Sequence, residues 1–189
     1  MCGSYHTDEE TFQELEVLLQ EEISCFLQKG DILPARPATA LVLEKGKRVL
    51  KELLWGFPTK SSLLINARSE TAEERISFRL ALQQGRCVLP ASSFYEKDSY
   101  GQKHRFYLPQ HSFFLAGIHR ELEGKDRFVI LTREANDSIR PFHQRMPLII
   151  SVKDLDQWLK GDYRALLKKD LPSFQEEDLS VLQLKGKAL

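Results

Sequence analysis

Two short strands are predicted within residues 86–97, RCVLPASSFYEK, because the runs Cys87–Leu89 and Ser93–Lys97 are separated by small residues. Further runs of this kind follow at His104–Leu108, Phe113–Ile118 and Arg127–Thr132. Short strands joined by turns are typical of antiparallel sheets. The chain is therefore predicted to be α+β, with an antiparallel, barrel-like core of short strands and helices at its periphery.

The region upstream of this segment carries a hairpin and another short strand. Ala40–Leu43 and Val49–Trp55 flank a predicted turn at residues 45–47, and Leu63–Asn66 is a further apolar run. Residues 33–37 contain two prolines and are predicted to form an irregular bend. The strand pattern thus extends through most of the first half of the chain.

Helices are predicted on both sides of these strands. Thr7 and Glu10 have capping-box spacing, and apolar residues recur at helical intervals for about 18 residues before Gly30. The later part of the chain is predicted to hold helices over Thr71–Gln84, Val152–Leu159 and near Tyr163–Leu167, and a final strand over Leu179–Leu184.

Length and composition narrow the class of protein. The 189 residues, 42% hydrophobic and 29% charged, are expected to form a single domain over residues 1–189. No secretory signal and no membrane-spanning run is evident, so we expect a cytoplasmic monomer. The net charge is zero, which does not favour a nucleic-acid binder, although a local groove of arginines remains compatible with it.

The histidines and cysteines show no metal-ligand spacing, and neither a metal nor a cofactor is expected. Three cysteines are too few, and odd in number, for a disulfide framework. Cys25 and Cys87 lie in apolar patterns and are predicted to be buried packing thiols. Cys2 has a different context, because it follows the initiator methionine directly.

Removal of Met1 would make Cys2 the N-terminus, with an amine and a thiol two carbons apart. Such a 1,2-aminothiol captures aldehydes: the amine forms an imine and the thiol then closes a thiazolidine ring. An α-amino group titrates near pH ~8 and a thiol near ~8.5, so reactive forms of both exist at neutral pH. The alternative interpretation is that Cys2 is an incidental exposed cysteine.

Asn66 and Arg68 follow an apolar strand. The Asn66 amide could position a sugar hydroxyl or the Cys2 amine, and the planar guanidinium of Arg68 suits a phosphate. The alternative is an ordinary strand-to-helix connection in which Ser69 caps the following helix.

Glu96, His143 and Arg145 are the other candidate functional residues. Glu96 shares a strand face with Phe94, so loss of solvation is expected to raise its pKa toward the range useful for proton transfer. His143 could protonate a leaving oxygen, and Arg145 could hold a phosphate. The alternatives are an exposed, inert glutamate and a structural histidine.

Taken together and in order, these segments resemble the SOS response-associated peptidase (SRAP) family of abasic-site shielding proteins. The resemblance runs from residue 1 to about 160. Its motifs are Met1-Cys2-Gly3, Trp55-Gly56-Phe57-Pro58, Asn66–Thr71, Arg86–Ala91, Phe94-Tyr95-Glu96, Phe114–Ile118 and His143–Pro147. The resemblance implies an α+β fold with a channel for single-stranded DNA, in which the N-terminal cysteine forms a thiazolidine with the ring-opened abasic site.

The resemblance also implies roles for individual residues. Cys2 would be the nucleophile, through both its amine and its sulfur, and Asn66 would orient the amine and the opened sugar. Glu96 would move protons during imine formation and ring closure, and His143 would assist opening of the deoxyribose. The family name further implies an autoproteolytic step that exposes Cys2, although ordinary removal of the methionine would suffice.

DNA contacts are implied for four more residues. Arg68 and Arg145 would grip flanking phosphates, and Trp55 and Pro34 would stack against or wedge apart unpaired bases. The chain departs from the family pattern at Ser4, where a basic residue is usual, at Lys97, where tryptophan is usual, and in a short stretch at residues 56–63. These departures predict weaker or differently shaped DNA binding.

Two other functions remain open from the sequence. One is an N-terminal-nucleophile amidohydrolase, which would use Cys2 as the nucleophile and Asn66 as an oxyanion donor. The other is a single-stranded DNA-binding module without covalent chemistry.

Overall fold

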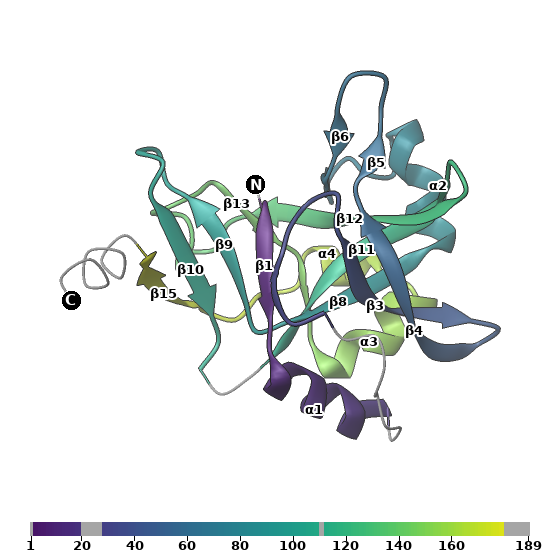
Figure 1. The fold of residues 1–189 in the computed structure, drawn as a ribbon, viewed down its shortest axis with the longest axis horizontal. Helices are drawn as coiled ribbons and strands as arrows, with labels where there is room; N and C mark the ends of the chain where they lie inside the picture. The colour runs from purple at the N-terminus through teal and green to yellow at the C-terminus, as the bar shows by residue number, and fades with distance from the viewer. Residues whose placement is uncertain (1, 20–27, 110–111, 180–189) are drawn as a thin grey trace.

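The computed structural model describes residues 2–19, 28–109 and 112–179, and within them strands outnumber helices (Figure 1). The smaller of the two main sheets has the strand order β15-β10-β9-β1-β2, and every pairing in it is antiparallel. Its strands are β1 (Ser4–Thr7), β2 (Gly30–Ile32), β9 (Ser93–Lys97), β10 (Lys103–Tyr107) and β15 (Gln175–Asp178).

The larger sheet has eight strands and follows the order β13-β12-β4-β3-β8-β11-β14, with β7 paired to β12. Because β12 also pairs with β11, the pairings pass from β12 through β4, β3, β8 and β11 back to β12. The strands are β3 (Pro37–Glu44), β4 (Lys47–Trp55), β7 (Asn66–Arg68), β8 (Arg86–Ala91), β11 (Phe113–Leu122), β12 (Lys125–Glu134), β13 (Arg145–Pro147) and β14 (Ile149–Ile150). A separate hairpin pairs β5 (Phe57–Pro58) with β6 (Leu63–Leu64).

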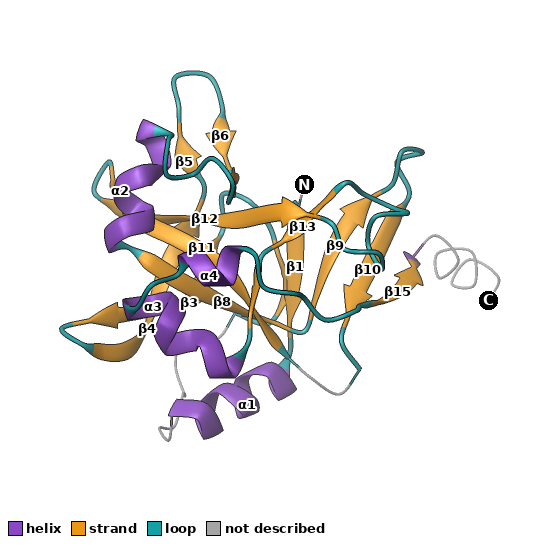
Figure 2. Ribbon diagram, turned by 180° about the vertical axis from the view of Figure 1, so that it is seen from behind, coloured by secondary structure: helices purple, strands orange, loops and turns teal. Residues whose placement is uncertain are grey.

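The α+β class with predominantly antiparallel sheets is confirmed, whereas the barrel-like character of the core stays a prediction. Two pairings are parallel, those of β12 with β4 and with β7. Figure 2 shows α3 and α4 in front of the larger sheet, with the smaller sheet beside it. The helical segments are α1 (Glu9–Leu19), α2 (Ile76–Gln84), the 3-10 turn at Val152–Asp154, α3 (Leu155–Lys160) and α4 (Arg164–Leu167).

The larger sheet is buried on both faces, which explains why β8 is a continuous apolar run. Val88 packs in a cluster with Trp158 of α3, whereas Cys87 and Leu89 pack in a second cluster with Phe94 of the smaller sheet. Cys87 is fully buried, as predicted. Successive side chains on a strand point to opposite faces, so this single strand joins both halves of the core.

Three helix predictions need correction. α1 begins at Glu9 with Asp8 as its cap, since the backbone N–H of Thr11 donates to Asp8 Oδ1 at 2.9 Å. The predicted capping residue Thr7 belongs to β1 instead. α2 begins at Ile76 rather than Thr71, and Ser69 does not cap it, because Arg75 occupies the N-cap position.

The helices predicted over Val152–Leu159 and near Tyr163–Leu167 are confirmed, although each differs slightly in its bounds. The rest of the first predicted helix, with Cys25, and residues 180–184 of the predicted final strand lie outside the described residues. The C-terminal strand that is described, β15, was not predicted.

Candidate functional site

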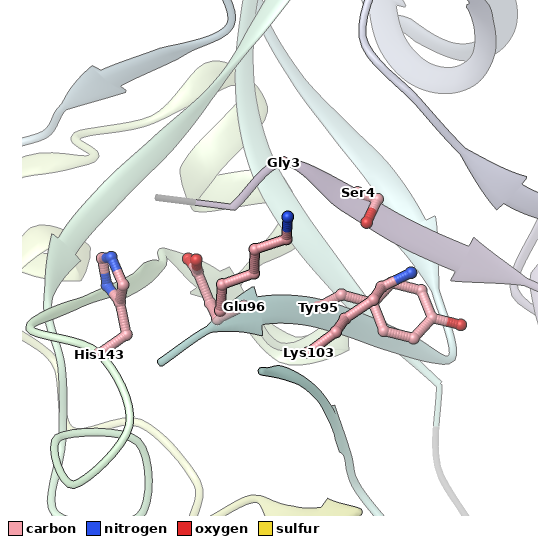
Figure 3. A pocket seen from close by; sticks show the side chains of 7 residues that line it. Gly3, Ser4, Tyr95, Glu96, Lys103 and His143 are labelled. Carbon is pink, nitrogen blue, oxygen red and sulfur yellow. The ribbon is translucent and has the colours of Figure 1, made fainter. Parts of the chain in front are cut away.

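A pocket of about 360 Å³ opens where the start of β1 lies beside the end of β9. Ser4 is paired with Tyr95 in the sheet, which brings the N-terminal segment over Glu96. Figure 3 shows Glu96 beside His143 at one side of this pocket, with Gly3 above them and Tyr95 and Lys103 at the other side. The residues that line it are Gly3, Ser4, Tyr95, Glu96, Lys97, Lys103 and His143.

Cys2 precedes Gly3, which lines the pocket. Its side chain is 0% exposed, and its thiol donates a hydrogen bond to the Ser4 carbonyl with an S–O distance of 3.6 Å. Burial, and then the nearby Glu96, raise the pKa of Cys2 well above the usual range of a thiol. Cys2 is therefore a buried, protonated thiol at neutral pH, which corrects the expectation of both an exposed cysteine and a reactive thiolate. The role of Cys2 as the nucleophile stays a prediction.

Asn66 reaches Cys2 from the other sheet. β7 pairs in parallel with β12, with Asn66 opposite Ile130, and this pairing fixes the position of the amide. The amide nitrogen donates to the Cys2 carbonyl at 2.8 Å. Its Oδ1 atom is buried and has no hydrogen-bond partner among the described residues, so an acceptor next to Cys2 remains available.

Glu96 is 4% exposed and shares its face of β9 with Phe94. Burial raises the pKa of Glu96, while nearby positive charge, including that of His143, works in the opposite direction. The raised pKa expected from the sequence is thus confirmed. A carboxyl group with a raised pKa is better suited to accept and return a proton than an exposed glutamate is.

His143 precedes β13 and is oriented by its own backbone. The N–H of Arg145 donates to His143 Nδ1 at 2.9 Å. Nδ1 also lies 3.0 Å from the Arg145 carbonyl oxygen, so these two backbone contacts fix the orientation of the ring. His143 and Glu96 both line the pocket, next to the segment that follows Cys2.

The two candidate phosphate-binding arginines differ in their surroundings. Arg145 is 14% exposed and makes a bidentate ion pair with Glu70, at 2.7 and 2.8 Å. Although burial opposes it, this contact holds the pKa of Glu70 below its usual range. Arg68 is exposed and has no ion pair with any other described residue.

Comparison with known proteins identifies the family of this chain. The family model for SOS response associated peptidase (SRAP) matches residues 1–187. The chain belongs to the SRAP family. Curated relatives include the abasic site processing protein YoqW of Bacillus subtilis, 26% identical, with 97% of this chain and 92% of the relative covered. The abasic site processing protein YedK of Escherichia coli is 27% identical, with 86% and 81% covered.

Solved structures share the fold of this SRAP chain. A phage-related protein from Bordetella bronchiseptica superposes with a TM-score of 0.77 at 21% identity, covering 94% of this chain and 93% of that one. A protein from Bacteroides thetaiotaomicron gives a TM-score of 0.70 at 17% identity, covering 94% and 91%. At these identities the structures support the SRAP fold alone.

The structure overturns one expectation about DNA contacts in this SRAP protein. Trp55 is 0% exposed: its ring stacks on Phe128 with centroids 5.8 Å apart, and its indole N–H donates to the Ile65 carbonyl at 2.9 Å. The expectation that Trp55 stacks on unpaired bases is therefore wrong, because no face of the ring is open. Pro34 lies half-buried in a turn before β3, and its role as a wedge stays a prediction.

Two lining residues of the SRAP pocket escaped the sequence analysis as functional candidates, namely Tyr95 and Lys103. Lys103 lies directly opposite Lys97 in the β9–β10 pairing, which a correct register for this hairpin would have revealed. In the parts of the chain that the structure describes, no group of side chains could hold a metal ion. No described helix is long and apolar enough to cross a membrane.

Proposed function

We propose that this protein recognises abasic sites in single-stranded DNA and shields them through a covalent thiazolidine formed by Cys2. The observation that carries the proposal is that Asn66 and Glu96 reach Cys2 from separate regions of the chain, with His143 beside Glu96. The curated relatives named as abasic site processing proteins support the same substrate. We expect the protein to act as a cytoplasmic monomer.

The first chemical step is opening of the closed deoxyribose. His143 donates a proton to the ring oxygen, Glu96 accepts the proton of the C1′ hydroxyl, and the sugar opens to the aldehyde. Glu96 and His143 line one pocket, and the positive charge of a protonated His143 favours the ionised form of Glu96. The pair can therefore exchange protons with a sugar bound between them.

The second step is capture of the aldehyde. Once Met1 has been removed, by autoproteolysis or by ordinary processing, the Cys2 amine attacks C1′ and loss of one water gives the imine. Asn66 holds the Cys2 carbonyl and so orients this backbone. The thiol then adds to C1′, its proton passing by way of Glu96 to the imine nitrogen. The sum is aminothiol plus aldehyde giving thiazolidine plus water.

Closing the ring protects the DNA. An imine acidifies the neighbouring C2′ proton, and loss of that proton expels the 3′ phosphate and cuts the strand. The thiazolidine lacks the imine, so this elimination stops. Arg68, Arg145 and Pro34 are proposed to hold the flanking strand, with Arg145 exchanging Glu70 for a phosphate.

The test is incubation with single-stranded DNA that contains one abasic site, followed by a denaturing gel and intact-mass analysis. Wild type is compared with Cys2→Ala and with Cys87→Ala, which removes a second fully buried thiol from the same apolar cluster. We expect a heat-stable adduct, with the mass of both partners less one water, for wild type and Cys87→Ala only.

Other outcomes contradict the proposal. Cleaved DNA without a stable adduct would identify a lyase that stops at the imine. If the assay shows no adduct and no cleaved DNA, the proposal is refuted and the N-terminal-nucleophile amidohydrolase is favoured. An assay of glutamine hydrolysis would then test that alternative. Reversible binding that is identical for wild type and Cys2→Ala would indicate a DNA-binding module without chemistry.

A further inference from the structure

Two lysines face each other across the strands that form the pocket. Lys97 at the end of β9 is directly opposite Lys103 at the start of β10, and both side chains line the pocket that contains Glu96 and His143. Like charges placed directly opposite each other destabilise a strand pair. A pair of lysines held at one cavity is therefore a site that an anion would stabilise.

The protein itself compensates these charges only in part. Lys103 Nζ lies 3.8 Å from the centroid of the Tyr95 ring, a cation–π contact that holds the ammonium in place. Its nearest carboxylate, Asp31, is 3.9 Å away and also accepts hydrogen bonds from Tyr95 at 2.9 Å and His6 at 2.7 Å. Lys97 is exposed, and no ion pair is found for it among the described residues.

Positive charge continues from this pair along the same face of β10. Residues two apart on a strand point to the same side, so Arg105 follows Lys103. Arg105 stacks over Tyr107, with its guanidinium carbon 5.3 Å from the ring centroid, and donates to Ser93 Oγ at 3.0 Å. Its ion pair with Glu177 is long, at 3.4 Å, so this cation is also incompletely neutralised.

β1, the strand next to β9, contributes no positive charge at the pocket. Ser4 is paired with Tyr95, beneath the Lys103 ammonium, and is uncharged. Figure 3 shows Ser4 above Tyr95 and Lys103. A DNA strand that delivers an abasic sugar to Cys2 must place its adjoining phosphate near this corner. Lysines from β9 and β10 supply there the positive charge that β1 does not.

We propose that Lys97 and Lys103 form a subsite for the backbone phosphodiester next to the abasic site, with Arg105 meeting the following phosphate. The proposal rests on the proposed function, since it assumes a DNA strand in the pocket. The occupant is a single strand because Lys103 and Arg105 lie against the rings of Tyr95 and Tyr107 on one sheet face. Cations and aromatic rings side by side are typical of surfaces that follow a flexible single strand. The subsite fixes which way the strand leaves the pocket, namely over the outer face of β9 and β10.

The test measures binding without covalent chemistry. Single-stranded DNA carrying a tetrahydrofuran abasic analogue cannot form an imine, and its binding is followed by fluorescence anisotropy at several salt concentrations. The double variant Lys97→Gln/Lys103→Gln is compared with Lys47→Gln/Lys125→Gln, a matched pair of exposed lysines at hairpins away from the pocket. Loss of the contact with one phosphate is expected to reduce the salt slope by about 0.7 and low-salt affinity by about tenfold.

A neutral methylphosphonate placed at one linkage at a time then locates the contact. We expect wild type to lose affinity at one or two linkages beside the abasic analogue, and the Lys97→Gln/Lys103→Gln variant to be insensitive at those linkages. Equal salt slopes for all three proteins, or an unchanged methylphosphonate profile in the variant, would overturn the subsite. Thermal unfolding controls for folding, and removing the like-charge pair should not lower the Tm.

Cross-linking to a natural abasic site separates the two proposals. If the proposed function fails, wild type forms no adduct with any substrate. If only the subsite fails, wild type and the Lys97→Gln/Lys103→Gln variant form adducts with the same DNA concentration dependence. If both hold, the variant needs about tenfold more DNA for half-maximal cross-linking and reaches the wild-type rate at saturation.

Discussion

Glu96→Gln is the substitution that most directly tests the proposed chemistry. Glutamine keeps the shape of the side chain, so the 4% exposed site stays filled, but it can neither accept nor return a proton. General acid–base catalysis by a positioned side chain contributes roughly 10²–10⁴-fold to rate. Glu96 is buried beside both the thiol of Cys2 and His143. We therefore expect the single-turnover rate of cross-linking at saturating DNA to fall by about 10²-fold or more.

The pH dependence of that rate identifies the group responsible. Glu96 accepts protons only when ionised, and burial raises its pKa. The wild-type rate should therefore decrease on acidification at a pH above the usual range of a glutamate. In Glu96→Gln this limb should be absent, leaving only the limb set by the Cys2 amine near pH ~8. Glu52→Gln, an exposed glutamate on β4, provides the matched control.

The same substitution should make the protein more stable. Because the pKa of Glu96 is higher in the folded than in the unfolded chain, the folded chain binds this proton more tightly. The stability gained from protonated Glu96 is therefore present at low pH and is lost as the pH rises through the folded-state pKa. Glu96→Gln should thus exceed wild type in its free energy of unfolding at pH 7 and match it at acid pH. A cross-linking rate within twofold of wild type, with an unchanged pH profile, would refute the role of Glu96.

Three further substitutions test other contacts. Asn66→Ala removes the hydrogen bond to Cys2 and should lower stability by about 1 kcal/mol and slow cross-linking, measured by urea unfolding and single-turnover kinetics; normal kinetics would exclude a positioning role. His104→Gln tests the ion pairs of His104, which raise its pKa although burial opposes them. The loss of stability relative to wild type should be largest below pH ~6.5 and shrink as the pH rises; a loss independent of pH would contradict this. Gly117→Ala should cost about 1–3 kcal/mol by thermal unfolding, since a Cβ there would lie 2.7 Å from Leu89; full stability would show that β8 can shift.

The strands were predictable because their sequence pattern follows directly from burial. β3, β8 and β12 are apolar runs, since the larger sheet is covered on both faces. β15 was missed because QEED has no apolar periodicity. It forms at the sheet edge next to β10, where Glu177 pairs with Arg105 and Glu176 with His104. An acidic strand stabilised by a distant basic one cannot be recognised from local sequence.

The contacts of the candidate site are likewise difficult to predict from local sequence. The apolar residues before Trp55 indicate a buried ring, whereas the resemblance to SRAP proteins implied stacking on bases. The proximity of Asn66 to Cys2 followed from that resemblance and from no feature of spacing, since 64 residues separate them. The pairing of Arg145 with Glu70, 75 residues apart, had no sequence signal. Long-range partners depend on strand register, which the chain alone does not specify.

The arrangement of acids explains how a chain of zero net charge can serve a DNA-binding role. Arg145 is held by Glu70, Arg105 by Glu177, and Lys103 lies near Asp31. Under the proposed function, each phosphate that binds must displace or share one of these carboxylates, so non-covalent affinity for any strand is reduced. An undamaged strand then dissociates, whereas a strand with an aldehyde is retained by the bond to Cys2. Under this proposal, discrimination between damaged and undamaged DNA resides in the covalent step. The carboxylates increase that discrimination because they weaken non-covalent binding of every strand.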